Sequence, residues 1–292
     1  MQTETVTLNG NPFFLRRWGD PSKPVLLLLH GFPEYSGAWA ELAPYLTDHF
    51  HCVAPDQRGF GRSHAPEGVD QYHIRHLSAD MAALIDHLGG RVTLMGHDWG
   101  ASVAYALAFG YADKIDRLII ANGVHPLLFQ RELAKGGAQS AASQYFHHLR
   151  APGADASFAA DNYAKLLRFF SANMELGWLD EARKADYLAA WSVGGGRLQT
   201  MCNWYRATPL QVAAPGQPIT DLPEYPPEAF TVRCPHLLIW GDGDTALLPE
   251  TTHGLERYAP DLTRVAVPGG DHWLCHQYPE QVAGAILTWM SR

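Results

Sequence analysis

The stretch Gly96-His-Asp-Trp-Gly100 decides how this chain folds. A short apolar run at 91–95 precedes it, and the alanine-rich segment 101–108 follows it. This order predicts a buried strand, a sharp turn and a helix. The glycines placed two residues before and after Asp98 let the backbone turn where a Cβ atom would not fit. We therefore expect Asp98 to lie at the tip of a strained turn.

The spacing of these glycines is that of the G-x-S-x-G nucleophile elbow of α/β-hydrolases, with Asp98 in place of the serine. An aspartate in this position can also cap the following helix. A cap, however, requires neither Gly96 nor Gly100. A carboxylate can attack an electrophilic saturated carbon but is a poor nucleophile for esters and amides. We therefore predict that Asp98 is a covalent nucleophile.

Composition excludes several classes of protein. The chain has 292 residues, 47% of them hydrophobic, so it can form one large domain or a core with an insertion. A formal charge of −8 argues against nucleic acid as a partner. The N-terminus resembles no signal peptide, and the longest apolar run, 25–29, is too short to cross a bilayer. We expect a cytoplasmic protein with no membrane partner, and either a monomer or a homodimer.

Apolar periodicity predicts a mostly parallel, twisted sheet flanked by helices, which is an α/β fold. An Asn-Gly turn at 9–11 predicts a hairpin at the N-terminus. Further strands are expected at 25–29, 52–56, 91–95, 117–121, 236–240 and 263–267. Helices are expected at 39–46, 73–88, 101–110, 249–258 and 279–290.

A helical block interrupts this alternation. Residues 126–229 contain helix-like stretches but no convincing strand, and they end in a proline-rich connector at 209–227. We therefore predict a core of residues 1–125 and 230–292, with 126–229 inserted as a helical lid.

A nucleophile of this kind needs a base that activates water and an acid that orients the base. In this fold the chain order is nucleophile, acid, histidine. His272 follows the last predicted strand, and Asp244 follows the preceding one. The alternative position for the acid holds Asn122, and Asp242 is more typical of a turn. We therefore predict the pair Asp244 and His272.

The segment His30-Gly-Phe-Pro-Glu34 follows the first buried strand, where an oxyanion-hole loop belongs. The backbone N–H groups of Phe32 and Trp99 are the predicted donors. A cis bond before Pro33 is a further hypothesis. His30 and Glu34 are expected as hydrogen-bond partners behind the site, although Glu34 is equally typical of a carboxylate at a helix start.

Taken together, these motifs resemble the epoxide hydrolases of the α/β-hydrolase fold over almost the whole chain. The strings that carry the resemblance are 30–34, Asp56-Gln-Arg-Gly-Phe-Gly-Arg-Ser63, 96–100 and Gly270-Asp-His-Trp273. In the lid, Ser143-Gln-Tyr-Phe146 and Asn203-Trp-Tyr-Arg206 are similar to the segments that hold the two lid tyrosines of this family. The resemblance thus assigns Tyr145 and Tyr205, which would otherwise be read as packing aromatics.

The resemblance implies the following reaction. Tyr145 and Tyr205 hold the epoxide oxygen and donate a proton, while Asp98 forms a hydroxyalkyl ester. His272, oriented by Asp244, then activates water, and a vicinal diol leaves. The expected partners are an apolar epoxide and water, with no cofactor and no metal. The aromatic side chains of Phe32, Trp99 and Trp191 suggest an apolar or aryl pocket.

Other functions remain open from the sequence alone. A haloalkane dehalogenase also uses an aspartate nucleophile but has no use for a tyrosine pair. A haloacetate enzyme carries arginines just after the nucleophile, where this chain has Trp99 and Ser102. Ser102 lies inside the predicted helix, which argues against a serine esterase. A binding protein that has lost catalysis is the alternative from a different class.

Overall fold

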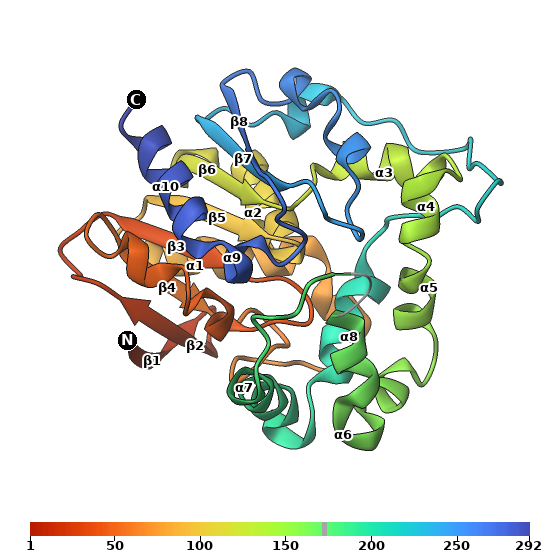
Figure 1. Cartoon of the computed structure of the whole chain (residues 1–292), viewed down its shortest axis with the longest axis horizontal. Helices are drawn as coiled ribbons and strands as arrows, with labels where there is room; N and C mark the ends of the chain where they lie inside the picture. The colour runs from red at the N-terminus through yellow and green to blue at the C-terminus, as the bar shows by residue number, and fades with distance from the viewer. Residues whose placement is uncertain (171–173) are drawn as a thin grey trace.

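A computed structural model describes residues 1–170 and 174–292 of the chain. A single sheet crosses the molecule (Figure 1). The first two strands pair antiparallel with their neighbours, and the strands that follow are parallel. In spatial order the strands are β1 (Gln2–Leu8), β2 (Asn11–Trp18), β4 (His51–Pro55), β3 (Val25–Leu29), β5 (Val92–His97), β6 (Ile115–Ala121), β7 (His236–Gly241) and β8 (Leu262–Val267).

Both faces of the sheet are covered, which explains why the central strands are apolar throughout. In β3, Leu27 and Leu29 join the core cluster that contains residues of α1 (Ile74–His87) and α2 (Trp99–Gly110). Leu26 and Leu28 instead join the cluster on the opposite face, which contains residues of α10 (Pro279–Met290). Successive strand residues point to opposite faces, so this five-residue apolar run fills two cores at once. The predicted α/β architecture, a mostly parallel sheet flanked by helices, is confirmed.

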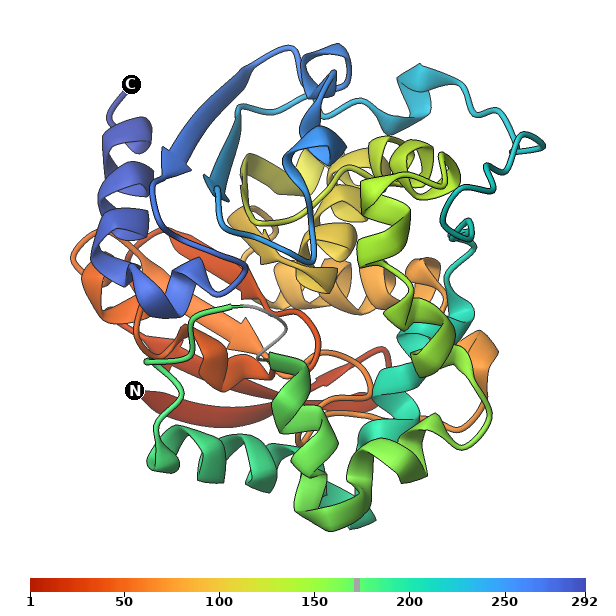
Figure 2. The same ribbon diagram turned by 45° about the vertical axis from the view of Figure 1, so that its right-hand side comes forward.

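The segment between β6 and β7 is largely helical. Within the described residues it contains no strand of the sheet. Its helices α5, α6 and α8 contact one another on one side of the sheet, far from the C-terminal helix α10 (Figures 1 and 2). The helices of the insertion are α3 (Pro126–Ala134), α4 (Ala138–Ala142), α5 (Tyr145–Arg150), α6 (Ala154–Phe170), α7 (Glu181–Ser192), η5 (Val193–Gly195), α8 (Leu198–Ala207) and η6 (Pro227–Phe230). The lid boundaries at 126 and 229 stay a prediction.

Two predicted helices were wrong. The segment 39–46 is no continuous helix: η1 (Ser36–Trp39) ends at its first residue, and η2 (Ala43–Leu46) forms its second half. Pro44 cannot donate a backbone hydrogen bond, which prevents one helix across the segment. The segment 249–258 likewise divides into η7 (Pro249–Thr252) and η8 (Leu255–Arg257), since Gly254 adopts a φ of +89° between them. The remaining short helices are η3 (Val69–Tyr72), η4 (Ala112–Lys114) and α9 (Leu274–Gln277).

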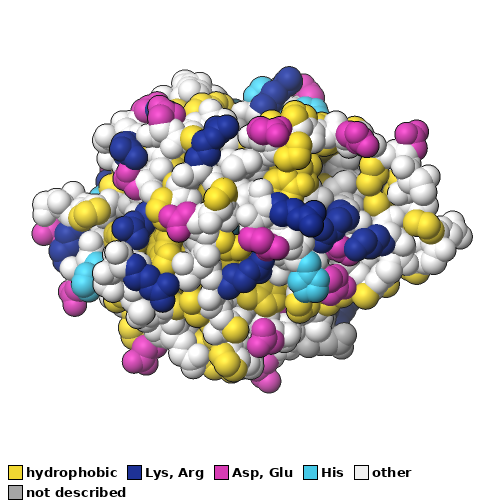
Figure 3. Space-filling model, turned by 90° about the horizontal axis from the view of Figure 1, so that it is seen from above, with side chains coloured by type: hydrophobic (Ala, Val, Ile, Leu, Met, Phe, Trp, Pro, Cys, Tyr) yellow, Lys and Arg dark blue, Asp and Glu magenta, His cyan; other side chains and the backbone are white. Residues whose placement is uncertain are grey.

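The surface carries charges of both signs. Figure 3 shows lysine, arginine and acidic side chains interspersed with hydrophobic ones over the face seen from above. Across the described parts of the chain, every helix falls short of the length or apolar content that a membrane crossing requires.

The turn between β5 and α2 has the strain predicted for it. Asp98 adopts a φ of +50°, a conformation that costs a non-glycine residue energy. A Cβ atom on Gly100 would lie 2.0 Å from the carbonyl oxygen of Leu29. A Cβ atom on Gly96 would lie 2.6 Å from the carbonyl oxygen of Gly100. Both glycines are therefore required by close approach of the backbone.

Gly100→Ala is expected to lower the free energy of unfolding by about 3 kcal/mol or more, because the new methyl group must displace backbone of β3. Gly110→Ala in the same helix is the matched control. A Cβ atom there meets nothing within 4 Å, so we expect stabilisation of up to ~1 kcal/mol. Urea unfolding followed by circular dichroism measures both, and equal effects of the two substitutions would contradict the close approach.

Candidate active site

The predicted site residues follow the carboxyl ends of neighbouring parallel strands. His30 comes directly after β3, Asp98 after β5 and Asp244 shortly after β7. His272 lies in the loop that follows β8. Because the strands are parallel, these loops meet at one edge of the sheet, which is where sites form in α/β proteins.

The two carboxylate oxygens of Asp98 have different partners. The backbone N–H of Phe32 donates to Oδ1 at 2.7 Å. Oδ2 lies 3.6 Å from Nε2 of His272. The side chain of Asp98 is 12% exposed. One oxygen is thus held by the loop after β3, and the other faces the imidazole. The N–H of Trp99, the second predicted donor, belongs to the first residue of α2, where amides have no partner within the helix.

Asp244 is buried and holds His272 through a hydrogen bond of 2.8 Å to Nδ1. The same Oδ2 accepts from the side-chain amide of Asn122 at 2.7 Å. Oδ1 accepts two backbone N–H groups, those of Ala246 and Leu247, each at 2.8 Å. Asn122, which holds the alternative position for the acid, therefore supplies a donor that fixes Asp244. Asp242, the turn candidate, is exposed.

These contacts shift the pKa values of the pair in opposite directions. Burial alone would lower the pKa of His272, but the carboxylates of Asp244 and Asp98 outweigh it and hold that pKa well above its usual value. Burial would raise the pKa of Asp244, but the charge and hydrogen bond of His272 lower it. Both shifts favour the charged forms of the pair, imidazolium and carboxylate.

The loop after β3 is fixed by His30. Its Nε2 accepts the N–H of Gln57 at 3.1 Å, which leaves Nδ1 to donate to the carbonyl of Gly31 at 2.9 Å. Burial lowers the pKa of His30, in keeping with a neutral ring. The Phe32–Pro33 bond is cis, as hypothesised. His30 thus positions the amide of Phe32 that contacts Asp98.

Glu34 lies in a buried hydrogen-bond network beneath the site. Its carboxylate accepts from Nδ1 of His97 at 3.0 Å and from Nε2 of His276 at 2.9 Å. Burial would raise the pKa of Glu34, yet these two hydrogen bonds hold it well below its usual value. Nε2 of His97 lies 2.8 Å from the carbonyl oxygen of His272. The network therefore links the loops after β3 and β8, and Glu34 serves no helix start.

Both predicted lid tyrosines reach the site. The rings of Tyr145 on α5 and Tyr205 on α8 are 6.1 Å apart between centroids and lie edge-to-face. Phe32 packs edge-on against Tyr205, with centroids 5.0 Å apart. Burial, and then the charge of Asp98 among other neighbours, raises the pKa of each phenol well above its usual value. Both hydroxyl groups are therefore kept protonated as donors.

Helix α8 is attached directly to the core, which fixes the position of Tyr205. Three side chains of this segment donate to backbone carbonyl groups of the loop after β4. The pairs are Arg197 Nε to Gly61 at 2.7 Å, Thr200 Oγ1 to Gly59 at 2.6 Å and Trp204 Nε1 to Arg58 at 2.9 Å. The string at 56–63 therefore serves as the docking loop for the helix that carries Tyr205.

A cavity of about 490 Å³ brings these groups together, a size suited to a small organic ligand. Its described lining combines the predicted residues Asp98, Tyr145, Tyr205 and His272 with apolar side chains and a few basic ones. The lining residues are Phe32, Asp98, Ala142, Tyr145, His148, Phe158, Lys165, Arg168, Phe169, Met174, Tyr205, Thr245, Ala246, His272 and Trp273.

Two of the predicted substrate contacts require correction. Trp191 is not among the described lining residues; it is 1% exposed and its Nε1 donates to the carbonyl of Pro33 at 2.6 Å. Trp191 therefore holds the lid against the loop after β3. The indole of Trp99 also does not line the cavity and packs edge-on against Tyr205 instead. Phe32 does line the cavity.

Several residues of the site escaped the sequence interpretation. The sequence offered a signal for both histidines of the Glu34 network: His97 lies inside the glycine-flanked elbow, and His276 follows His272 by four residues. Phe158, Phe169 and Met174 carry no motif, and only tertiary packing brings them to the cavity.

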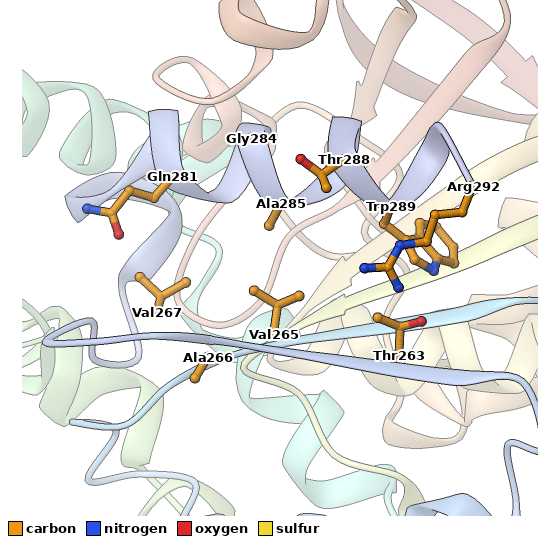
Figure 4. A pocket seen from close by; sticks show the side chains of 10 residues that line it. All are labelled: Thr263, Val265, Ala266, Val267, Gln281, Gly284, Ala285, Thr288, Trp289 and Arg292. Carbon is orange, nitrogen blue, oxygen red and sulfur yellow. The ribbon is translucent and has the colours of Figure 1, made fainter.

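A second cavity of about 320 Å³ lies away from this site, between β8 and α10 (Figure 4). Side chains of the edge strand, among them Thr263 and Val265, face Gln281, Thr288 and Arg292 of the C-terminal segment across it. It contains none of the predicted site residues.

The fold and the site together define an α/β-hydrolase, and the α/β-hydrolase fold family matches residues 24–279. A solved structure from a study of novel epoxide hydrolases of this superfamily in metagenomes from hot environments has a TM-score of 0.91 and 33% identity, covering 99% of this chain and 98% of that one. The chain therefore belongs to the epoxide hydrolases of the α/β-hydrolase superfamily.

Curated relatives agree with this placement. Epoxide hydrolase A of Mycobacterium tuberculosis is 28% identical, over 98% of this chain and 96% of its own length. The AB hydrolase superfamily protein YfhM of Bacillus subtilis is 29% identical, over 99% of this chain and 98% of its own length.

Proposed function

We propose that this chain hydrolyses an apolar epoxide to a vicinal diol through a covalent ester on Asp98. The observation that carries the proposal is the shared cavity, whose wall includes Asp98 and His272 from the core and Tyr145 and Tyr205 from the lid. The names of the relatives support the same reaction.

In the first step the epoxide ring opens. Tyr145 and Tyr205 donate hydrogen bonds to the epoxide oxygen, and one of them transfers its proton as the C–O bond breaks. Oδ2 of Asp98 attacks the ring carbon, because Oδ1 already accepts the amide of Phe32. The product of this step is a hydroxyalkyl ester whose carbonyl oxygen is Oδ1.

In the second step water cleaves the ester. His272, oriented by Asp244, removes a proton from the water that attacks Cγ of Asp98. Negative charge develops on Oδ1, where the amides of Phe32 and Trp99 stabilise it. The Cγ–Oδ2 bond then breaks, the imidazolium of His272 returns the proton to Oδ2, and the diol leaves with the original Oδ2. The second proton of the water leaves the new carboxyl group of Asp98 and restores the tyrosine that gave up its proton in the first step. The water oxygen stays on Asp98.

A dehalogenase is the nearest rival because it begins with the same attack. The tyrosine pair favours the epoxide reaction, since a halide leaving group needs no proton. Ser102 on α2 offers no charge for a haloacetate carboxylate.

A single turnover in ¹⁸O-water, with enzyme in excess over an aryl epoxide, tests the proposal. We expect unlabelled diol in the first turnover and one labelled oxygen on Asp98, found by peptide mass spectrometry. Labelled diol in the first turnover would overturn the covalent aspartate. Halide release from chloro- and fluoro-substrates, without epoxide turnover, would favour the rival.

Tyr205→Phe is expected to slow formation of the ester by about 10²-fold to 10³-fold, because ring opening loses a proton donor. Hydrolysis of the ester should change little, since the epoxide oxygen is already protonated by then. Stopped-flow fluorescence separates the two rates. Tyr225→Phe is the control, because Tyr225 is 47% exposed on the proline-rich connector. An unchanged rate of ester formation in Tyr205→Phe would refute its role as donor.

The hydrolysis step is expected to have its own pH dependence. The carboxylates of Asp244 and Asp98 raise the pKa of His272 in the free enzyme. Ester formation removes the charge of Asp98, so the pKa of His272 falls in the intermediate. Hydrolysis needs the neutral imidazole; its rate should therefore rise with pH through this lowered pKa and then level off. Decay of preformed ester between about pH 5 and pH 9 measures it, and a rate that falls with pH would contradict the role of base.

A further inference from the structure

The cavity that contains Asp98 has a basic rim. His148 of α5 and both Lys165 and Arg168 of α6 line it, whereas Asp98 is the acidic residue among its described lining residues. The three basic residues are exposed, but His272 is only 3% exposed. This gradient of exposure places the basic groups at the solvent end and the reacting groups at the deep end.

The basic rim contrasts with the formal charge of the whole chain, which is −8. Lys165 and Arg168 are three residues apart in the second half of α6, so their like charges share one helix face and repel weakly. The ammonium group of Lys165 contacts only neutral partners among the described residues, namely Oγ of Ser157 at 2.8 Å and the ring of Phe158 at 4.5 Å. Neutral contacts leave its positive charge uncompensated at the mouth.

The wall of the cavity between its solvent end and its deep end is apolar. Phe158, Phe169, Met174 and Trp273 contribute to it, and the ring of Phe169 contacts those of Phe32 and Tyr145. A ligand that fills this cavity would therefore meet hydrogen-bond donors at the deep end, an aromatic middle and positive charge at the mouth.

We propose that the preferred substrate is an epoxide with an apolar body and a carboxylate at its far end, which Lys165 and Arg168 bind at the mouth. This inference rests on the proposed function and adds the class of substrate. A guanidinium can bind a carboxylate through two parallel hydrogen bonds, and an ammonium adds a point charge. Both groups are solvated, so their effect depends on ionic strength.

Two substrates with the same apolar body test the proposal, one an epoxy acid and the other its methyl ester. At low ionic strength we expect kcat/KM of the acid to exceed that of the ester by about fivefold to tenfold. The advantage should shrink towards unity as sodium chloride is raised to about 0.5 M. An acid used no better than its ester at low salt would overturn the proposal.

Substitutions at Lys165 and Arg168 test whether the preference for the acid over its ester depends on the basic rim. Lys165→Gln combined with Arg168→Gln should reduce the ratio of acid to ester to about one, mainly through KM of the acid. Lys165→Glu combined with Arg168→Glu should instead favour an epoxide with a terminal ammonium group, a gain that misfolding cannot produce. Lys184→Gln is the matched control, because this lysine pairs with Glu181 on α7 and does not line the cavity. A ratio unaltered by the rim variants would refute the assignment.

The proposed epoxide hydrolysis and the proposed carboxylate site are contradicted by different results. If neither acid nor ester is hydrolysed, the proposed function is wrong. If both are hydrolysed without preference for the acid, the epoxide reaction stands and the carboxylate site does not.

Discussion

Asp98→Asn is expected to lower epoxide turnover by about 10⁴-fold or more, because an amide oxygen is a far weaker nucleophile than a carboxylate. The substitution keeps the shape of the side chain. Its amide oxygen can still accept the N–H of Phe32, which now donates to Oδ1 at 2.7 Å. Loss of activity would therefore report the chemistry of the attack. Steady-state diol formation measures the effect, and an unchanged melting temperature shows that the fold is retained.

The control for this substitution is Asp242→Asn. Asp242 lies two residues before Asp244 but is exposed, so turnover should stay within about twofold of wild type. The intact mass of the Asp98→Asn protein must also be measured, because hydrolysis of the new amide would restore the aspartate. Activity within tenfold of wild type, at a mass that confirms the amide, would exclude Asp98 as the nucleophile.

The sequence was informative wherever a local pattern has a single physical explanation. A five-residue apolar run such as 25–29 has to be buried on both faces, and a glycine frame around Asp98 has to be a tight turn. The parallel sheet and the order of strand, turn and helix follow from such patterns. The parallel order of the strands then brings Asp98, Asp244 and His272 to one edge of the sheet.

Patterns with two explanations were less informative. Segment 39–46 has helical periodicity, but its proline prevents a continuous helix. Trp191 and Phe169 are both lid aromatics, yet one binds the carbonyl of Pro33 and the other faces the cavity. Hydrophobicity alone cannot distinguish these cases, because the difference lies in which neighbours tertiary packing supplies. The same holds for Glu34, whose imidazole partners are distant in sequence.

His272→Gln is expected to separate the two steps of the reaction. Ring opening uses Asp98 and the tyrosines, so the variant should still form the ester, whereas hydrolysis loses its base and should slow by about 10³-fold to 10⁴-fold. Enzyme mixed with epoxide should therefore gain the mass of one substrate molecule, carried by the peptide that contains Asp98. Asp98→Asn should gain none. His147→Gln is the control, since His147 is an exposed histidine of α5 and does not line the cavity.

Accumulation of the ester in His272→Gln is a more discriminating result than loss of activity. A misfolded protein cannot accumulate a stoichiometric adduct on one residue. The adduct also distinguishes the role of His272 from that of a charge that merely orients Asp98. Nε2 of His272 lies 3.6 Å from Oδ2 of Asp98, close enough for an imidazolium to act on that oxygen by its charge alone. If that charge were its main contribution, His272→Gln would slow ester formation instead, and no adduct would appear. A folded variant that turns over slowly without accumulating ester would therefore reject His272 as the base, while leaving the covalent aspartate to be judged from the labelled-water experiment.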